Sequence, residues 1–366
     1  MTQISMHEKY IKLCFEIARK GQYFASPNPL VGCVIIKDDN IIATGYHEKY
    51  GSLHAERNAI LGANENLEGS TLYCNLEPCM HTDKQTPPCA PLIIASGIKR
   101  VVISNLDVNP KVKGKGVQQL KDAGIEVITN VLEDEGYELN KFYFKAQRFG
   151  IPHITLKIAT SKDGMITEEE GRQTWLTGKE SKVFVHKLRA EHDAILIGAN
   201  TVNIDNPQLT VREIDGKNPK RIIIDGKLFS NLDSNIYNDS KGETIVFCSN
   251  KVDESRKAAF YEKPITLVEI ETDHDMHLII YDILAKLVQF KINSLLVEGG
   301  NLIFEQFLNS NCFDELFHIQ TPVILKKGLL VADSLTFINL ALQKETTLGK
   351  DKLYQYKNLK SKCLPD

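Results

Sequence analysis

The sequence lacks the features that would mark a membrane, secreted or nucleic-acid-binding protein. No apolar run in its 366 residues approaches the roughly 18 residues of a membrane-spanning helix. Segment 1–20 is polar and amphipathic, without the apolar core of a secretory signal. The formal net charge is −3, so the chain has no basic excess for binding nucleic acid non-specifically. We therefore expect a cytoplasmic protein with neither nucleic acid nor a membrane as a partner.

The chain has eight cysteines, but a cytosolic chain of this size needs no disulfide framework. Of the eight cysteines, five stand singly in apolar or terminal surroundings: Cys14, Cys33, Cys248, Cys312 and Cys363. We interpret these five as small buried side chains or inert surface thiols. Cys79 and Cys89 differ, because each follows a proline and they are separated by nine residues. This arrangement makes them candidate metal ligands.

Length and pattern divide the chain into two domains. A chain of 366 residues is too long for one typical domain. Gly150 and Pro152 follow a charged helical segment, and glycine followed by proline is a helix stop signal. We place the boundary there, which gives domains at 1–150 and 151–366.

Helical and extended segments alternate in both domains, which predicts the α/β class. In the first domain we expect helices at 5–21, 54–64, 89–96, 116–123 and 132–148, and strands at 30–36, 41–45, 70–76, 100–104 and 125–131. In the second we expect helices at 179–191, 276–291 and 302–310, and strands at 154–159, 194–198, 221–225, 244–248, 265–270, 294–298, 313–325 and 353–357. Several strands of the second domain are continuous Ile/Val/Leu runs, which indicates a parallel sheet covered on both faces.

The residues with the clearest chemistry are His54, Glu56, Cys79 and Cys89. One histidine and two cysteines suit tetrahedral zinc with a fourth position open to water, the arrangement of a catalytic zinc site. Glu56 lies two residues after the histidine, so it is better placed to carry protons than to share the metal. His-x-Glu followed by Pro-Cys and a second Cys is the signature of zinc deaminases. The alternatives are a structural zinc or ordinary thiols without metal.

For two further residues near this motif, the residue type alone leaves the role open. His81, between the cysteines, suits either a substrate contact or an exposed histidine. Asn28 stands between two prolines before an expected strand, and a simple turn explains it as well as a ring contact does.

Taken together, the motifs resemble the bifunctional deaminase–reductase family of bacterial riboflavin biosynthesis. They stand in family order over residues 8–325: SPNPLVGCVI, GYHEKYGSLHAE, LEPCMHTDKQTPPC, AGIEV, LKIATSKDG, WLTG, LRAEHDAILIGANTVNIDNPQLTVR, RIIIDG and VEGGNLI. The resemblance implies a cytidine-deaminase-like α/β/α domain followed by a dihydrofolate-reductase-like α/β domain. It also implies two activities. The first is hydrolytic deamination of a diamino-ribosylamino-pyrimidinone 5′-phosphate at one zinc ion per chain. The second is NADPH-dependent reduction of the product's ribosyl group to ribityl.

The resemblance also assigns site residues. It implies Glu56 as the catalytic residue and His54, Cys79 and Cys89 as zinc ligands. For NADPH it implies contacts from Ala159, Trp175, Thr201, Asp205, Gly226, Gly300, Asn301 and Leu302. For the substrate it implies contacts from Asn28, Lys157, Gln173, Arg189, Leu209, Arg212 and Glu298. A guanidinium fork matches a phosphate, so the two arginines suit the substrate's phosphate group.

The chain departs from the family pattern at several loops. The loop between the zinc-motif cysteines is one residue longer than usual, and the usual Asp-Pro-Asn-Pro reads Asp107-Val108-Asn109-Pro110. Lys162 replaces a leucine, and Gln173 replaces a frequent serine. These last two put details of the reductase pocket in question.

Three rival functions share parts of the pattern. The first is a nucleoside or tRNA deaminase, which predicts no second α/β domain. The second is a deaminase fused to a non-catalytic domain, and the third is a zinc-stabilised regulator without turnover, for which Glu56 would have no use. We expect the bifunctional enzyme, acting on a small-molecule substrate and assembling as a homo-oligomer.

Overall fold

The chain folds into two compact units, residues 1–148 and 149–366. The computed structural model describes residues 3–80, 86–109, 112–169, 171–272, 278–330 and 339–361. No helix in these ranges is both long enough and apolar enough to cross a membrane.

The first unit is an α/β/α sandwich around a five-stranded sheet of order β2-β1-β3-β4-β5. Its strands are β1 (Gly32–Lys37), β2 (Asn40–Tyr46), β3 (Thr71–Leu76), β4 (Arg100–Asn105) and β5 (Glu126–Ile128). Its helices are α1 (Gln3–Ala18), α2 (Ala55–Leu61), α3 (Cys89–Ala95), α4 (Lys115–Asp122), α5 (Glu133–Leu139) and α6 (Lys141–Phe149), with a short 3-10 turn at Arg19–Gly21. β1 is antiparallel to β2 and β3, and β3, β4 and β5 are parallel.

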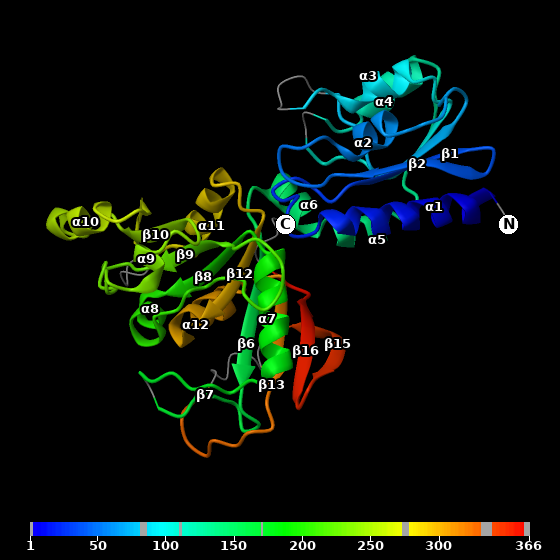
Figure 1. The fold of residues 1–366 in the computed structure, drawn as a ribbon. Coiled ribbons are helices and arrows are strands. Elements are labelled where there is room, and N and C mark those ends of the chain that lie inside the picture. Colours follow the sequence, from blue (N-terminus) through cyan, green and yellow to red (C-terminus); the bar gives the residue numbers. More distant parts are fainter. Residues whose placement is uncertain are drawn as a thin grey trace. The chain divides into compact units, whose positions relative to one another are not determined.

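Alternation of side chains along these strands supplies a core on each face of the sheet. Cys33, Ile35 and Leu72 point to the face that α2, α3 and α4 cover. Val34 and Tyr73 point to the other face, against α1. Figure 1 shows α2, α3 and α4 on one side of this sheet and α1 and α5 on the other. The predicted α/β class and the layered arrangement of this domain are therefore confirmed.

The second unit is built on a nine-stranded sheet of order β11-β10-β9-β8-β12-β6-β13-β16-β15. Its strands are β6 (His153–Thr160), β8 (Ala194–Gly198), β9 (Lys220–Ile224), β10 (Thr244–Ser249), β11 (Thr266–Ile270), β12 (Ser294–Gly299), β13 (Glu315–Gln320), β15 (Leu340–Leu348) and β16 (Asp351–Asn358). A small sheet pairs β7 (Met165–Thr167) with β14 (Leu329–Leu330). The strands from β11 to β13 in this order are parallel. β16 is antiparallel to β13, and β15, antiparallel to β16, again runs in the common direction.

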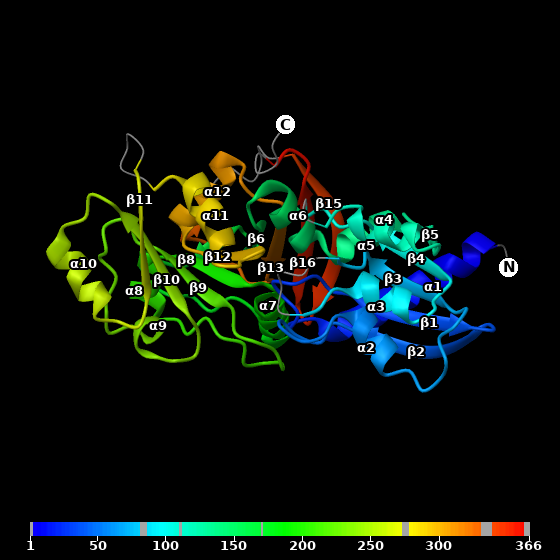
Figure 2. The same cartoon turned by 90° about the horizontal axis from the view of Figure 1, so that it is seen from above.

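Helices cover both faces of this sheet, as the continuous apolar strands predict. The helices are α7 (Lys179–Glu191), α8 (Ala199–Asp205), α9 (Asn235–Asn238), α10 (Glu254–Tyr261), α11 (Ile280–Gln289) and α12 (Asn301–Ser310). Figure 2 shows α11 and α12 on one face and α7 and α9 on the other. Odd and even residues of β8 accordingly belong to different core clusters, with Leu196 on the α11–α12 face and Ile197 on the opposite face.

One expectation about the elements is wrong, and several elements were not predicted: the helices α8, α9 and α10 and the strands β7, β14 and β15. The helix predicted at 132–148 is two helices, because the chain breaks at Asn140. The Asn140 side chain instead accepts a hydrogen bond from Leu30 N and donates one to Leu30 O, at 2.8 and 2.9 Å. The strand β15 was not predicted, since most of its residues are exposed and polar and give no alternating pattern.

Candidate active sites

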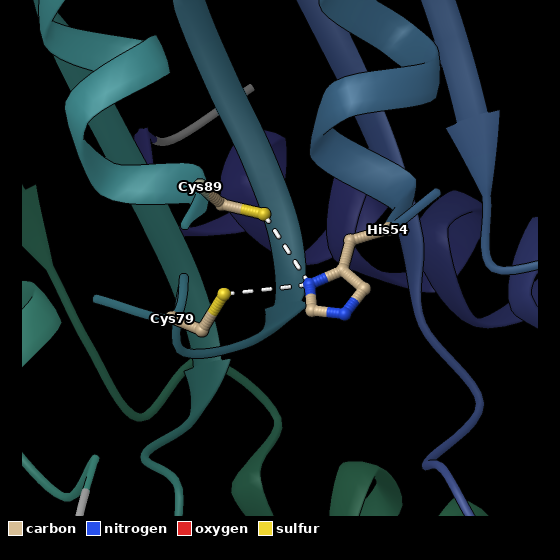
Figure 3. Close-up of side chains that lie close together, drawn as sticks. All are labelled: His54, Cys79 and Cys89. Atoms are coloured by element: carbon tan, nitrogen blue, oxygen red, sulfur yellow. Dashed lines mark hydrogen bonds between the residues drawn. The ribbon is translucent and has the colours of Figure 1, made fainter. Parts of the chain in front are cut away.

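The predicted zinc ligands meet in the first unit. His54 immediately precedes α2, Cys79 lies in the loop after β3, and Cys89 is the first residue of α3. Figure 3 shows the three side chains pointing toward one another. His54 Nδ1 lies 3.4 Å from Cys79 Sγ and 3.5 Å from Cys89 Sγ, and the three candidate ligand atoms all lie within 4.8 Å of one another.

These distances fit a zinc ion. Zinc bonds of about 2.3 Å to sulfur and about 2.0 Å to nitrogen, at tetrahedral angles, place a sulfur ligand atom and a nitrogen ligand atom about 3.5 Å apart. One imidazole and two thiols are also the donor set that zinc prefers. His54 Nε2 lies 3.0 Å from Thr86 Oγ1, and such a contact to the second ring nitrogen fixes the ring for binding through Nδ1.

The loop between the two cysteines is closed at its base by the backbone. The amides of Cys89 and Ala90 both donate to Cys79 O at 3.0 Å, so the thiols stay together whatever the loop length. A hydrogen bond from Cys89 lowers the pKa of Cys79, which favours a thiolate there. The prediction for His81 lies outside the described residues.

Glu56 lies in the first turn of α2, beside these ligands, and is 3% exposed. Burial raises its pKa to about 7, while the neighbouring His54 and a hydrogen bond with Cys89 lower it. A carboxyl group that changes protonation near neutral pH, next to the metal ligands, is suited to moving protons.

A second glutamate, which sequence reasoning missed, supports the cysteine loop. The buried Glu77 accepts three backbone hydrogen bonds, from Asp107, Gly114 and Val117, at 3.1, 2.9 and 3.2 Å. It thereby fixes the segment after β4 against the end of β3. The available signal was an acidic residue directly after an apolar strand and before Pro78-Cys79.

His47, also missed, connects Asn28 to the zinc ligands. Asn28 Nδ2 donates to His47 Nε2 at 3.0 Å, and His47 Nδ1 donates to Leu53 O at 3.0 Å. The His47 ring stands edge-on to the His54 ring, with centroids 5.7 Å apart. Asn28 is therefore held near the ligand set, and its contact with a substrate ring stays a prediction.

In the second unit, the predicted cofactor residues follow the carboxyl ends of parallel strands. Thr201 and Asp205 lie on α8, directly after β8, and Gly226 follows β9. Gly300 and Asn301 follow β12, and Ala159 is near the end of β6. Because these strands are parallel, their carboxyl ends lie at one edge of the sheet, where ligands bind in open α/β folds.

The turn at Gly300 fits a phosphate group of a dinucleotide. Gly300 has φ 64°, and a Cβ there would lie 2.9 Å from Thr201 Oγ1, so only glycine leaves the space open. Asn301 Nδ2 donates to Glu305, whereas its buried Oδ1 has no hydrogen-bond partner among the described residues. The α12 N-terminus adds unpaired backbone amides to this space.

A charged cluster lies on the α7 face of this sheet. Glu298 accepts hydrogen bonds from Arg189 Nε at 2.6 Å and Nη2 at 2.8 Å, and Lys157 Nζ lies 3.5 Å from Glu298 Oε2. Burial alone would raise the pKa of Glu298, but these two cations lower it to about 2. Burial raises the pKa of Asp205, and the charge of Lys157 opposes this rise.

The remaining residues predicted to contact the substrate or NADPH divide into two groups. Leu209 is buried with φ 52°, and Arg212, three residues on, is exposed, with its Nη1 donating to Thr210 Oγ1 at 2.6 Å. Gln173 is exposed in the segment between β7 and α7, and Trp175 in the same segment is 82% exposed. Leu302 is also exposed, on the first turn of α12.

Lys162, the substituted loop residue, is exposed in the turn after β6. Its amide donates to Val323 O at 2.6 Å, and the adjacent Asp163 accepts from the amides of Leu325 and Lys326. The turn keeps its hydrogen bonds despite the substitution.

The fold and the two sites define a two-domain zinc deaminase–reductase. Residues 4–105 match the cytidine and deoxycytidylate deaminase zinc-binding region, and residues 152–354 match the RibD C-terminal domain. The riboflavin biosynthesis protein RibD of Bacillus amyloliquefaciens is 41% identical over 321 residues, covering 87% of this chain and 85% of the relative.

Solved structures agree over nearly the whole chain. RibD of Acinetobacter baumannii superposes with a TM-score of 0.89 at 32% identity, covering 98% of this chain and 100% of that one. A diaminohydroxyphosphoribosylaminopyrimidine deaminase/5-amino-6-(5-phosphoribosylamino)uracil reductase from Thermotoga maritima gives a TM-score of 0.84 at 36% identity, covering 97% and 99%. The chain belongs to the RibD family of riboflavin biosynthesis proteins. It is an enzyme with a zinc-binding deaminase domain and an NADPH-dependent reductase domain.

Proposed function

We propose that this chain catalyses two consecutive steps of riboflavin biosynthesis. Residues 1–150 deaminate a diaminohydroxyphosphoribosylaminopyrimidine, and residues 151–366 reduce the ribosyl group of the product, 5-amino-6-(5-phosphoribosylamino)uracil. The observation that carries the proposal is the presence in one chain of the His54–Cys79–Cys89 cluster and of the Lys157–Glu298–Arg189 cluster. The names of the similar solved proteins give the substrates.

In the deaminase domain, His54, Cys79 and Cys89 would hold zinc, which supplies an activated water for hydrolysis when bound. Glu56 takes up the two protons of that water in turn and delivers one to the ring nitrogen and the other to the leaving amino group, which departs as ammonia. Its burial supports this role, because a carboxyl group with a raised pKa exchanges protons near neutral pH. Asn28, fixed by His47, hydrogen-bonds the pyrimidine edge.

In the reductase domain, Ala159, Thr201, Asp205, Gly226, Gly300, Asn301 and Leu302 line the NADPH site, with Trp175 at its exposed border. Bound NADPH supplies the hydride that the ribosyl carbon accepts. Lys157, held at Glu298, donates a hydrogen bond to the ribosyl oxygen as the ring opens. Arg212 is free of carboxylates in the described contacts and binds the 5′-phosphate.

The other substrate contacts follow from position. Glu298, fixed by Arg189, accepts hydrogen bonds from ribosyl hydroxyls, so Arg189 contributes to the pocket through this ion pair. Leu209 is buried three residues before Arg212, and Gln173 lies in the loop before α7.

We further infer a homo-oligomeric, cytoplasmic enzyme with small-molecule partners and with neither nucleic acid nor a membrane among them. A net charge of −3 supports the exclusion of nucleic acid. Light scattering of the purified chain tests the assembly, and a mass equal to one chain would overturn that part.

The two reactions are tested separately on the full chain. Zinc-loaded protein given the diamino substrate should release ammonia without NADPH, and protein given the deaminated phosphate should oxidise NADPH without releasing ammonia. Ammonia release without any NADPH oxidation would support the rival in which the second domain is non-catalytic.

A further inference from the structure

One face of α7 holds the segment that carries Arg212. Lys182, His186 and Arg189 are spaced four and three residues apart, so they share this face. Lys182 Nζ lies 2.8 Å from Glu213 Oε1. His186 Nδ1 accepts a hydrogen bond from Arg212 N at 3.0 Å, and Arg189 Nη1 donates to Thr210 O at 3.3 Å.

His186 is the buried member of this set, with 2% of its surface exposed. Because Nδ1 accepts the Arg212 amide proton, the ring carries its own proton on Nε2 and is neutral. Burial and the charges of Arg189 and Arg212 lower the pKa of His186 to about 4, against the opposing charges of Glu213 and Glu298. The imidazole is therefore a fixed acceptor throughout the neutral pH range.

These contacts form a continuous path between the two ends of the proposed substrate site. Glu298 is held by Arg189, which also donates to Thr210 O. Thr210 Oγ1 accepts from the Arg212 guanidinium at 2.6 Å, and the Arg212 backbone is anchored on His186. The distance from the Glu298 carboxylate to the Arg212 guanidinium is thus set by α7.

We propose that His186 is a positioning residue that fixes Arg212 relative to Glu298, so that the two residues can bind the 5′-phosphate and the ribosyl group of one substrate. This inference rests on the proposed function, in which Arg212 binds that phosphate. His186 then determines specificity for phosphorylated substrates without touching them. A merely structural histidine would instead act on the stability of the domain and on all substrates alike.

Two variants separate these roles. His186→Leu keeps much of the volume and removes the acceptor, whereas His186→Asn places an amide oxygen where Nδ1 lies. Loss of an acceptor for a single amide costs on the order of one hydrogen bond, so we expect KM for the deaminated phosphate to rise about tenfold in His186→Leu. His186→Asn should restore KM to within about threefold of the wild type.

The test measures KM and kcat on the full chain with NADPH, using the deaminated substrate with and without its 5′-phosphate. His186→Leu should raise KM for the phosphate form alone, with kcat and the KM for NADPH unchanged. In an Arg212→Ala background the same substitution should have no further effect, because the group it positions is gone. Lys182→Met, which removes an exposed contact of the same segment, is the matched control and should change KM by less than about twofold.

The outcomes distinguish a failure of the positioning role of His186 from a failure of the proposed function. Equal KM changes for both substrate forms, additive effects of His186→Leu and Arg212→Ala, or failure of His186→Asn to restore KM would overturn the positioning role alone. An unchanged KM in Arg212→Ala would overturn the phosphate assignment of the proposed function as well.

Discussion

The two active sites of this chain are assembled in different ways. The proposed zinc ligands lie within residues 54–89, at the starts of two helices and in one loop. The residues proposed for the reductase site extend from Lys157 to Leu302, and many of them follow parallel strands that end at one edge of a sheet. A metal site is therefore visible in residue types and spacing, whereas the second site depends on topology.

The two buried glutamates show the same contrast in their electrostatics. Burial raises the pKa of Glu56 to about 7. Glu298 is also buried, yet Arg189 and Lys157 outweigh burial and hold its pKa at about 2. One carboxyl group is suited to moving protons, and the other is a permanent anion that organises its neighbours.

The largest expected effect is loss of zinc. Wild-type protein should hold about one zinc per chain, and Cys89→Ser should hold none and release no ammonia, because a three-ligand site loses a thiolate. Reduction of separately supplied deaminated phosphate should persist. Elemental analysis measures the metal, and full zinc occupancy in the variant would refute the ligand assignment.

The next largest effect is expected when the ion pair of Glu298 is broken. Arg189→Met leaves a buried carboxylate short of a cation, which should lower the free energy of unfolding by about 3–5 kcal/mol. Arg100→Ala, which removes an exposed pair with Glu126, is the control and should cost less than about 1 kcal/mol. Denaturant titration compares the two, and equal losses would contradict the buried role.

The same variant has a defined pH dependence. The pKa of Glu298 lies below its ordinary value of 4.5, so the contribution of the carboxylate is present above about pH 4.5 and is lost as the pH falls toward 2. Arg189→Met raises that pKa, so the variant has little of this contribution to lose. The difference in the free energy of unfolding between wild type and variant should therefore shrink as the pH falls from neutral toward 2, and denaturant titration at each pH measures it.

Glu56→Gln should lower deamination about 10²-fold or more, because positioned proton transfer contributes on that order. Zinc content and NADPH oxidation of the deaminated phosphate should not change. Ammonia release near the wild-type rate would show that Glu56 does not carry the protons, and the contrast drawn between the two glutamates would then be wrong.

The smallest expected effect is at the proposed phosphate contact. Arg212→Ala should weaken binding of the deaminated phosphate by about 1.5–3 kcal/mol, the value of a charge-assisted hydrogen bond. The KM for NADPH should be unchanged in steady-state kinetics. A shift in the NADPH value alone would place this arginine at the cofactor instead.

The sequence allowed prediction where a pattern is local. The α/β class followed from alternating segments, and His54, Cys79 and Cys89 followed from ligand chemistry. Asn140 breaks a predicted helix because it binds Leu30, 110 residues earlier, and no local pattern reports such a partner. β15 is exposed and polar, so pairing with β16 defines it rather than hydrophobic periodicity.

The same reason explains why three residues near the sites could not be predicted. Glu77, His47 and His186 are ordinary residue types whose roles depend on backbone atoms elsewhere in the fold. Only the family resemblance singled out the reductase residues, since glycines, a lysine and scattered arginines occur in many α/β domains. The roles of these residues are determined by their tertiary contacts.

The most direct test of two complete sites in one chain is the stoichiometry of the coupled reaction. Zinc-loaded full-length protein is given the diamino substrate and NADPH, and released ammonia and oxidised NADPH are counted together. We predict one NADPH oxidised for each ammonia released. Ammonia release with no NADPH oxidation would contradict the account.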